Sequence, residues 1–314
     1  MKRIAFALVA ATMLASPSFA ATKIGVSMAK FDDNFLTVLR NGIIAQGKDL
    51  GVQIQVLDAE NDVGKQLDQI KNFAADKVDA IIVNPVDTSA TQAMTDAASA
   101  SKVPLVYVNR QPVNVDTLPA NQAFVASNEA DSGTLETKQI CKLLAAKGLK
   151  NADIYVIEGE LSNQAAVQRT KDIHEVMAGP DCGVKLNILS EQTANWSRDE
   201  AQSLVTNWLS TGKKFDAIIS NNDEMAIGAI QALKAAGKDP KATPIGGVDA
   251  TQDALAALQA GDLAATVFQD AAGQGKGALD AAIKLSKGEK VERKVYVPFQ
   301  LVTLENIGNF IKKN

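Results

Sequence analysis

The sequence predicts an α/β protein made of two similar lobes, each a doubly wound parallel sheet with helices on both faces. Short apolar runs rich in β-branched residues alternate with longer amphipathic segments, and this alternation is typical of βαβ units. The same pattern occurs twice along the chain, which indicates a duplicated architecture. The chain has 314 residues, 46% of them hydrophobic, and is longer than one hydrophobic core usually serves.

Residues 1–20 have the features of a secretory signal peptide and are not expected to belong to either lobe. Lys2 and Arg3 give a positive start, and Ile4–Ala15 form an apolar run that is too short to cross a bilayer as a helix. Small residues then precede an expected cleavage site after Ala20. The mature chain is therefore expected to be exported.

The first half of the mature chain alternates predicted strands with predicted helices. Right-handed crossovers between parallel strands would place these helices on both faces of the sheet. The expected strands are Lys23–Met28, Val52–Asp58, Ala80–Asn84, Leu105–Asn109 and Ala123–Ala126, and the expected helices are Leu36–Leu50, Gly64–Asp76, Thr88–Ser101 and Glu129–Lys147.

The second half repeats this order. Val78–Asn84 recurs as Phe215–Asn221, and Pro104–Asn109 has its counterpart in Pro244–Asp249, at nearly equal offsets. In both halves a polar residue ends the strand. The expected strands are Ile154–Glu158, Lys185–Ser190, Ala217–Ser220, Pro244–Asp249 and Ala265–Gln269, and the expected helices are Ala165–Ala178, Arg198–Thr211, Ala226–Gly237 and Gln252–Gly261.

Polar residues at strand ends are candidates for a binding site, because doubly wound sheets bind ligands beyond the carboxyl ends of their strands. Asp, Asn, Gln and Arg offer paired donors or acceptors that match adjacent hydroxyl groups, and an aromatic ring can cover the C–H face of a hydroxylated ring. Taken singly, each candidate is as readily explained as a helix cap or a surface group. The candidates are Asn109, Arg110, Arg169, Asn222, Asp249 and Gln269, with Phe35 and Trp196 as stacking rings.

Nothing in the sequence indicates an enzyme, a metal site or a cofactor. The single histidine, His174, lies in a predicted helix and is expected to be a solvated surface residue. No Cys/His cluster has metal-ligand spacing, and no G-x-S-x-G motif is present. Gly273–Gly277 looks like a phosphate loop but falls inside a helical stretch. The net charge of −4 and the lack of a basic stripe argue against nucleic acid as a partner.

The chain has two cysteines, Cys141 and Cys182. An exported protein meets an oxidising compartment, which favours a disulfide between them. The alternative is a pair of buried free thiols.

Several segments resemble the periplasmic ribose/galactose-type solute-binding proteins of ABC importers, which have the type I periplasmic binding protein fold. The resemblance covers nearly the whole mature chain and rests on Asn34–Leu36, Asp58–Asp62, Asn84–Asp87, Asn109–Gln111, Asn222–Ala229 and Gly247–Ala250. Within this family the sequence is similar to the rhizopine-binding and inositol-binding group. That likeness is carried by Phe31–Phe35, Glu191–Arg198 and Val295–Phe299.

The resemblance implies a site and a hinge. It makes Phe35 and Trp196 the stacking aromatics, Arg110 and Arg169 the hydroxyl-binding arginines, and Asn222, Asp249 and Gln269 the polar contribution of the second lobe. It also implies three crossings between the lobes, near Ser127, Asp270 and Phe299. The expected N-terminal lobe is then 21–127 plus 270–298, and the expected C-terminal lobe is 128–269 plus 299–314.

Two departures from the ribose-binding pattern bear on the ligand. Asn109 stands where ribose binders have an aspartate, and Ala29-Lys30 replaces a small hydroxyl residue after the first strand. The acidic residues Asp32, Asp33 and Glu160 would suit a ligand with an amino group, or they simply form a solvated acidic surface. The predicted ligand is a cyclic polyol, an inositol or an inosamine, and the alternative is a pentose or hexose such as ribose.

The resemblance also implies the partners and the location. It implies a monomeric periplasmic protein that captures its ligand by closing the hinge and delivers it to an inner-membrane ABC permease. A chemoreceptor or a sensor kinase is the alternative or additional partner, because a sensory binding protein would have the same fold. An effector module of a transcriptional repressor shares the fold but is rejected, because the chain begins with a signal peptide instead of a helix-turn-helix.

Overall fold

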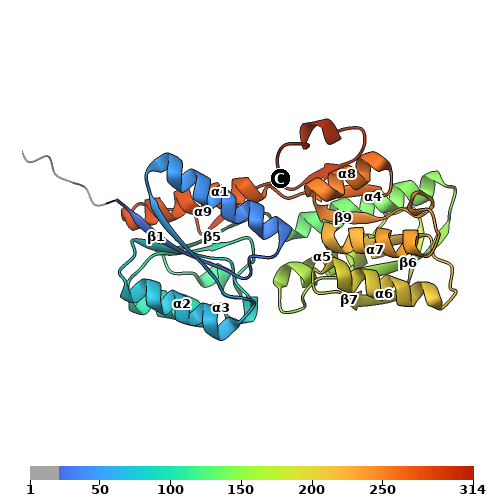
Figure 1. Ribbon diagram of the computed structural model, residues 1–314. Coiled ribbons are helices and arrows are strands. Elements are labelled where there is room, and N and C mark those ends of the chain that lie inside the picture. Colours follow the sequence, from blue (N-terminus) through green and yellow to red (C-terminus); the bar gives the residue numbers. More distant parts are fainter. Residues whose placement is uncertain (1–20) are drawn as a thin grey trace, which may run out of the picture.

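The computed structural model, described here for residues 21–314, consists of two α/β lobes that lie side by side (Figure 1). The signal peptide expected at residues 1–20 lies outside the described residues. The C-terminal end of the chain lies at the junction of the lobes (Figure 1). The fold class predicted from the sequence, two doubly wound lobes with mainly parallel sheets, is confirmed.

The N-terminal lobe contains a six-stranded parallel sheet with the strand order β11-β5-β4-β3-β1-β2. Helices α1 and α9 cover one face, and α2 and α3 cover the other (Figure 1). The strands are β1 (Lys23–Met28), β2 (Gln53–Asp58), β3 (Ala80–Val83), β4 (Leu105–Val108), β5 (Gln122–Ala126) and β11 (Lys294–Tyr296), and the helices are α1 (Asn34–Leu50), α2 (Val63–Ala75), α3 (Thr91–Ala100) and α9 (Ala271–Ser286).

The C-terminal lobe contains two three-stranded sheets, β7-β6-β8 and β9-β10-β12, which a parallel bridge between Ile218 and Ile245 connects. Only β12 is antiparallel to its neighbour. The elements are β6 (Asn151–Glu158), β7 (Lys185–Thr193), β8 (Ala217–Ser220), β9 (Gly246–Asp249), β10 (Ala265–Phe268) and β12 (Gln300–Val302), with α4 (Ser132–Ala146), α5 (Gln164–Ala178), α6 (Arg198–Ser210), α7 (Asp223–Ala235) and α8 (Gln252–Ala260).

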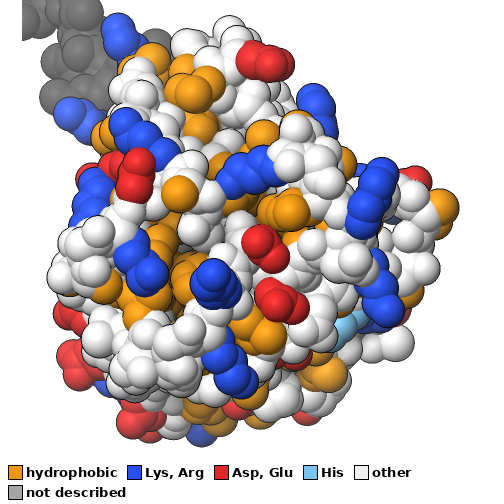
Figure 2. All heavy atoms as spheres, turned by 90° about the vertical axis from the view of Figure 1, so that its right-hand side faces the viewer, with side chains coloured by type: hydrophobic (Ala, Val, Ile, Leu, Met, Phe, Trp, Pro, Cys, Tyr) orange, Lys and Arg blue, Asp and Glu red, His pale blue; other side chains and the backbone are white. Residues whose placement is uncertain are grey.

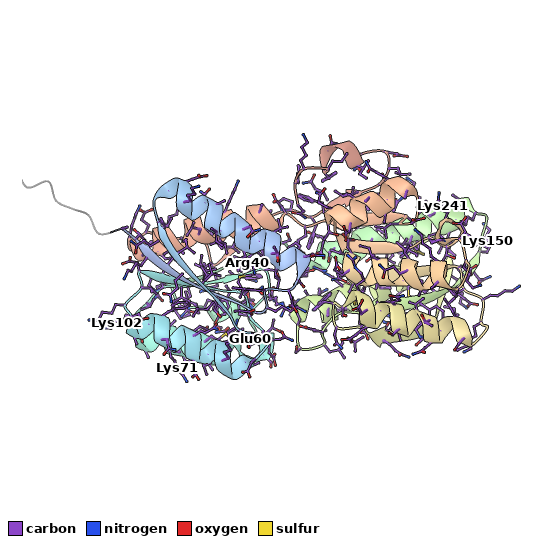
Figure 3. All side chains as sticks on the ribbon, viewed as in Figure 1. Arg40, Glu60, Lys71, Lys102, Lys150 and Lys241 are labelled. Carbon is purple, nitrogen blue, oxygen red and sulfur yellow. A yellow bond between two sulfur atoms is a disulfide. The ribbon has the colours of Figure 1, made fainter. Side chains whose placement is uncertain are left out.

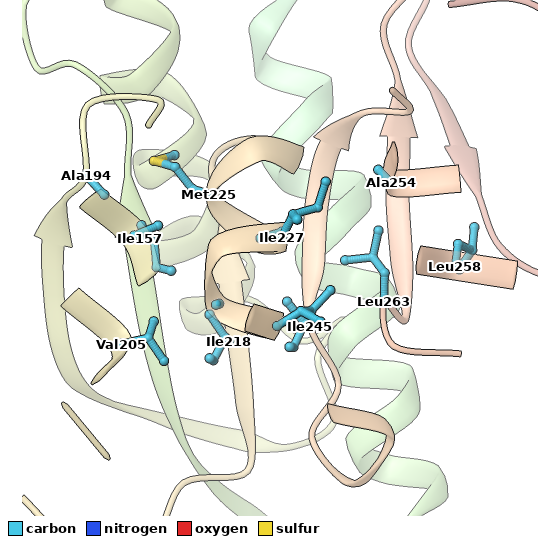
Figure 4. Close-up of a cluster of buried hydrophobic side chains, with 14 of the residues drawn as sticks. Ile157, Ala194, Val205, Ile218, Met225, Ile227, Ile245, Ala254, Leu258 and Leu263 are labelled. Atoms are coloured by element: carbon cyan, nitrogen blue, oxygen red, sulfur yellow. The ribbon is translucent and has the colours of Figure 1, made fainter. Parts of the chain in front are cut away.

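Each lobe has an apolar layer on both faces of its sheet. In the C-terminal lobe, Val205, Ile218 and Ile227 belong to the cluster between the sheet and α6, α7 and α8 (Figure 4). The opposite cluster packs α4 and α5 against the sheet. The outer end of this lobe presents acidic and basic side chains interspersed with apolar ones (Figure 2). Each lobe therefore has a packed core of its own.

The chain crosses between the lobes three times: after β5, after β10, and between β11 and β12. The connecting segments follow Ala126 of β5 and Phe268 of β10 and span 297–299 between β11 and β12. At the first, Ser127 accepts a hydrogen bond from Gln274 Nε2 of α9 (3.0 Å). The two short strands β11 and β12 were not among the strands expected from the sequence. Their pairing with β5 and β10 ties the last crossing to both sheets.

Cys141 in α4 and Cys182, which precedes β7, form a disulfide with an Sγ–Sγ distance of 2.01 Å. It lies in the apolar cluster between α4, α5 and the sheet, close to the amino end of β7. Within residues 21–314, no helix has both the length and the apolar character needed to cross a membrane. In the same part of the chain, no group of three or more His, Cys, Asp or Glu side chains is placed to hold a metal ion.

Candidate functional site

One cavity between the lobes brings together the side chains that the sequence predicts for the site. It contains about 450 Å³ of empty space, which includes solvent at its mouth. The cavity is lined by all of the predicted ligand-binding residues, namely Asp33, Phe35, Asn109, Arg110, Arg169, Trp196, Asn222, Asp249 and Gln269, and also by Leu36, Asn163, Ala165 and Glu224.

The strand ends and the helix starts of both lobes deliver these residues. Asp33 precedes α1 and caps it, because its Oδ1 accepts a hydrogen bond from the Leu36 N–H (2.8 Å). Asn222 caps α7 in the same way through the Met225 N–H (3.0 Å). Each cap fixes its side chain at a helix N-terminus that points toward the cavity. Asp33 and Asn222 are therefore both helix caps and cavity residues, so the two interpretations of the sequence do not exclude each other.

Arg169 is the most heavily hydrogen-bonded side chain of the cavity. Its Nε and Nη2 donate to both carboxylate oxygens of Glu129 (2.8 and 3.0 Å), and its Nη1 and Nη2 donate to Asn221 O (2.7 Å) and Gln269 Oε1 (3.3 Å). Burial is the largest single influence and works against the charged guanidinium, but the charge and hydrogen bonds of Glu129, together with the charges of Asp249 and Glu136, outweigh it and raise the pKa of Arg169. A guanidinium has five N–H donors, so one remains for a ligand.

Trp196 lies against the loop that follows β6. An added Cβ on Gly159 would lie 2.2 Å from the Trp196 ring, so only glycine allows this contact. Trp196 has a φ of 63°, a left-handed backbone that the packed ring holds in place. Its ring centroid lies 5.6 Å from Arg169 Cζ, which gives a cation–π contact inside the cavity wall.

Asp249 ends β9 and contributes a buried carboxylate with no hydrogen-bond donor among the described residues. Burial raises its pKa well above the ordinary value, Arg169 lowers it in part, and Asp223 raises it further. The backbone φ of 125° is unusual for a non-glycine residue. Asn314 Nδ2 holds this backbone by donating to the carbonyl oxygens of both Asp249 and Gln269 (2.7 Å each).

Arg110 and Asn109 reach the cavity from the end of β4. Arg110 Nη1 donates to the carbonyl oxygens of Pro85 (3.0 Å) and Val86 (3.1 Å), which anchors the side chain to its own lobe. Asn109 has a left-handed φ of 67° and donates through Nδ2 to Gln274 Oε1 (3.3 Å). The N-terminal lobe thus presents one cation and one amide to the cavity.

Two acidic residues weighed from the sequence for a ligand amine, Asp32 and Glu160, lie outside the cavity lining, and so does Phe31, the first residue of the Phe31–Phe35 segment. Phe31 packs under Arg40, whose Cζ lies 4.2 Å from the ring centroid, and does not line the cavity. Asp32 is exposed outside the cavity, in a surface groove at its edge. Glu160 points its carboxylate at Lys30 and Arg110 of the other lobe and is not among the residues that line the cavity, and its contact with an amino group of the ligand stays a prediction. Its negative charge pairs with two cations across the boundary between the lobes.

Two acidic residues that sequence reasoning did not select belong to the site. Glu224 lines the cavity and accepts a hydrogen bond from Asn34 Nδ2 of the other lobe (2.8 Å). Glu129 supports Arg169 from behind. Glu224 lies two residues after Asn222, which was a usable signal, but nothing in the sequence links Glu129 to an arginine 40 positions later.

Two hinged α/β lobes with a polar cavity between their strand ends define a two-lobed solute-binding protein. The comparisons with known proteins agree: the periplasmic binding protein domain matches residues 24–290, and the chain belongs to that family. It is 60% identical, over the full length of both chains, to a Rhizobium meliloti protein named "Putative rhizopine-binding protein". These matches confirm the family expected from the sequence.

Solved structures are similar as well. A solute-binding protein of an ABC transporter from Bacillus halodurans, with bound myo-inositol, shares 35% identity and a TM-score of 0.86, over 95% of this chain and all of that one. The Caulobacter myo-inositol binding protein, also with bound myo-inositol, shares 28% identity and a TM-score of 0.82, over 94% and 97% of the two chains. Both of these relatives are binding proteins for a small solute.

Proposed function

We propose that this protein is the substrate-binding component of an ABC importer and captures a cyclic polyol, an inositol or an inosamine, between its lobes. One observation carries the proposal. The predicted residues line a single cavity that combines two aromatic rings with two guanidinium groups and three carboxylates, those of Asp33, Glu224 and Asp249. The relatives that bind myo-inositol, and the rhizopine-binding relative, support the same ligand class.

The residues match such a ligand group by group. Phe35 of one lobe and Trp196 of the other offer flat faces to the C–H faces of a saturated ring. Asp249 accepts from two neighbouring hydroxyl groups, or from an ammonium group whose charge offsets the cost of burying the carboxylate. Gln269 adds a buried Nε2 with no partner in the described structure, a donor for a ligand oxygen. Glu224 is paired with Arg198 (2.9 Å), Arg110 with Glu160 and Arg169 with Glu129. Among the described residues, Asp33 and Asp249 are the cavity carboxylates without an ion-pair partner, and this favours an amino-substituted cyclitol.

Capture follows from the geometry. Phe35, Asn109 and Arg110 belong to one lobe, and Arg169 and Asp249 belong to the other, so a ligand gains all its contacts only when the lobes are closed. Closure is then a population shift driven by the difference in affinity between the closed and open states. We place the lobe boundaries at 21–127 plus 270–298 and at 128–269 plus 299–314.

The remaining assignments extend this function. We propose that the mature chain works in the periplasm after cleavage at Ala20, as a monomer, and delivers its ligand to an inner-membrane ABC permease. We propose no catalytic role, since the cavity groups are hydrogen-bonding partners without a paired nucleophile and base. A chemoreceptor or sensor kinase is a second candidate partner, because it would recognise the same closed shape.

A thermal-shift panel tests the ligand class. Purified mature protein is heated with inositols, inosamines, pentoses and hexoses, each at equal concentration, because a bound ligand raises the unfolding temperature by mass action. The proposal predicts the largest increase with myo-inositol or an amino-substituted inositol. Stabilisation by ribose alone would overturn the ligand assignment and leave the family assignment intact.

A further inference from the structure

Glu160 of the C-terminal lobe is a meeting point for side chains of the N-terminal lobe. Its carboxylate lies 3.8 Å from Lys30 Nζ and 3.5 Å from Arg110 Nη2, and it accepts a hydrogen bond from Asn61 Nδ2 (3.4 Å). These partners come from three separate loops at the strand ends of the other lobe. The Glu160 side chain is only 11% exposed, so solvent screens the contacts weakly.

The loop that carries Glu160 makes the neighbouring lobe-to-lobe contacts too. Ser162 O accepts hydrogen bonds from the N–H (3.1 Å) and Oγ1 (3.0 Å) of Thr88. Thr88 Oγ1 in turn accepts from the Gln164 N–H (3.1 Å). The loop is also fixed to the cavity, since Gly159 packs against the Trp196 ring. Loop 159–164 therefore connects a cavity wall of one lobe to the strand ends of the other.

We propose that Glu160 is a positioning residue that orients Arg110 toward the ligand and sets the lifetime of the closed state. The inference rests on the proposed capture by lobe closure. Arg110 is anchored to its own lobe through Nη1, and Nη2 is directed at Glu160 only when the lobes meet. A contact that forms only in the closed state lowers the free energy of that state, relative to the open state, by the whole free energy of the contact.

The charges make Glu160 more important than any single partner. Lys30 and Arg110 are both cations and share this one carboxylate. Without it, two positive charges would face each other at a nearly dry boundary, whereas loss of Lys30 leaves the Arg110 pair intact. At the opposite edge of the cleft, the neutral Asn34 side chain donates to Glu224. This contact does not replace the attraction between Glu160 and the two cations.

Stopped-flow kinetics with myo-inositol test the proposal on Glu160→Gln, Glu160→Asp, Lys30→Met and wild type. We expect Glu160→Gln to dissociate myo-inositol about tenfold faster, with the association rate and the ligand-free unfolding temperature nearly unchanged. Lys30→Met should show a smaller effect, and Glu160→Asp should restore part of the lifetime. Glu175→Gln is the matched control, because Glu175 forms an exposed pair with Lys171 (3.1 Å) within the same lobe.

The lobe separation supplies a measurement that needs no ligand. Labels on Lys71→Cys and Lys150→Cys, which lie on different lobes away from the cleft (Figure 3), report the distance by energy transfer. Glu160→Gln should shift the ligand-free distances toward the open state. If wild type does not bind myo-inositol, the proposed ligand is wrong. The change in the ligand-free distance between the two labels then still tests the role of Glu160. An unchanged dissociation rate, or unchanged distances where no ligand binds, would overturn the proposal.

Discussion

Replacing Asp249 with asparagine should weaken ligand binding and stabilise the ligand-free protein at the same time. The carboxylate is buried in the cavity wall, where burial raises its pKa, and among the residues described no donor hydrogen-bonds to it. A charge in that position costs folding free energy, and a bound ligand recovers it. Asparagine keeps the shape of the side chain and removes the charge.

The size of each effect follows from the contacts. A hydrogen bond to a charged group contributes about 1.5–3 kcal/mol, so loss of the Asp249 contact should raise Kd by about 10- to 150-fold. The unfolding free energy of the ligand-free protein should rise by about 1–2 kcal/mol near pH 7.5. The pKa of Asp249 is higher in the folded protein than in the unfolded chain, so the unfolding free energy of wild type falls as pH rises between these two pKa values. Asp249→Asn has no titrating group at this position, so its unfolding free energy lacks the contribution of Asp249 to that fall.

Calorimetric titration with myo-inositol and urea unfolding at pH 5 and pH 7.5 measure the two effects. Asp68→Asn is the control, since Asp68 forms an exposed pair with Lys71 (3.4 Å) far from the cavity. It should change neither quantity. Wild-type affinity of Asp249→Asn, or an unfolding free energy below that of wild type at pH 7.5, would refute the reasoning. A variant that merely misfolds would lose both affinity and stability, so the predicted gain in stability distinguishes the two cases.

Three further predictions concern the structure around the cavity. Replacing Cys141 and Cys182 with serine removes a link across 41 residues, which the chain-entropy relation makes worth about 4 kcal/mol; urea unfolding should show that loss with an unchanged Kd for myo-inositol. Gly159→Ala places a Cβ 2.2 Å from Trp196, so affinity should fall at least about tenfold by titration, whereas Gly308→Ala, with nothing within 4 Å, should bind normally. Burial raises the pKa of Glu136 to about 8, so the unfolding free energy of wild type should fall as pH rises from about 4.5 to 8. In urea unfolding, Glu136→Gln should lose the part of this slope that Glu136 contributes, up to about 1.4 kcal/mol per pH unit. An unchanged slope would contradict this prediction.

Residues at strand ends could be placed from the sequence because the fold fixes where strands end. The strands that end at or just before Asn109, Asn222 and Asp249 are short and buried along their whole length, and parallel strands bring their carboxyl ends to one edge. The duplicated pattern added the second lobe and, with it, the cleft. Trp196 could be placed because it lies in the loop that follows β7, whereas for Arg169, which lies inside α5, the family resemblance added the specific role of a hydroxyl-binding arginine.

Residues that act through a distant partner could not be placed in this way. Glu129 looks like one more acidic residue before a helix, and only the fold brings it to Arg169. Glu160 was weighed from the sequence as an acidic group for a ligand amine or as part of a solvated surface, and only the fold shows its carboxylate turned to Lys30 and Arg110 of the other lobe. The strands β11 and β12 have three residues each, too few for an alternating pattern to show.

A crystal structure of the mature protein with bound myo-inositol tests the central claim most directly. The account predicts the ring between Phe35 and Trp196, with its hydroxyl groups within hydrogen-bond distance of Arg110, Arg169 and Asp249. A ring bound at any other surface, or lobes that stay apart around it, would contradict the account.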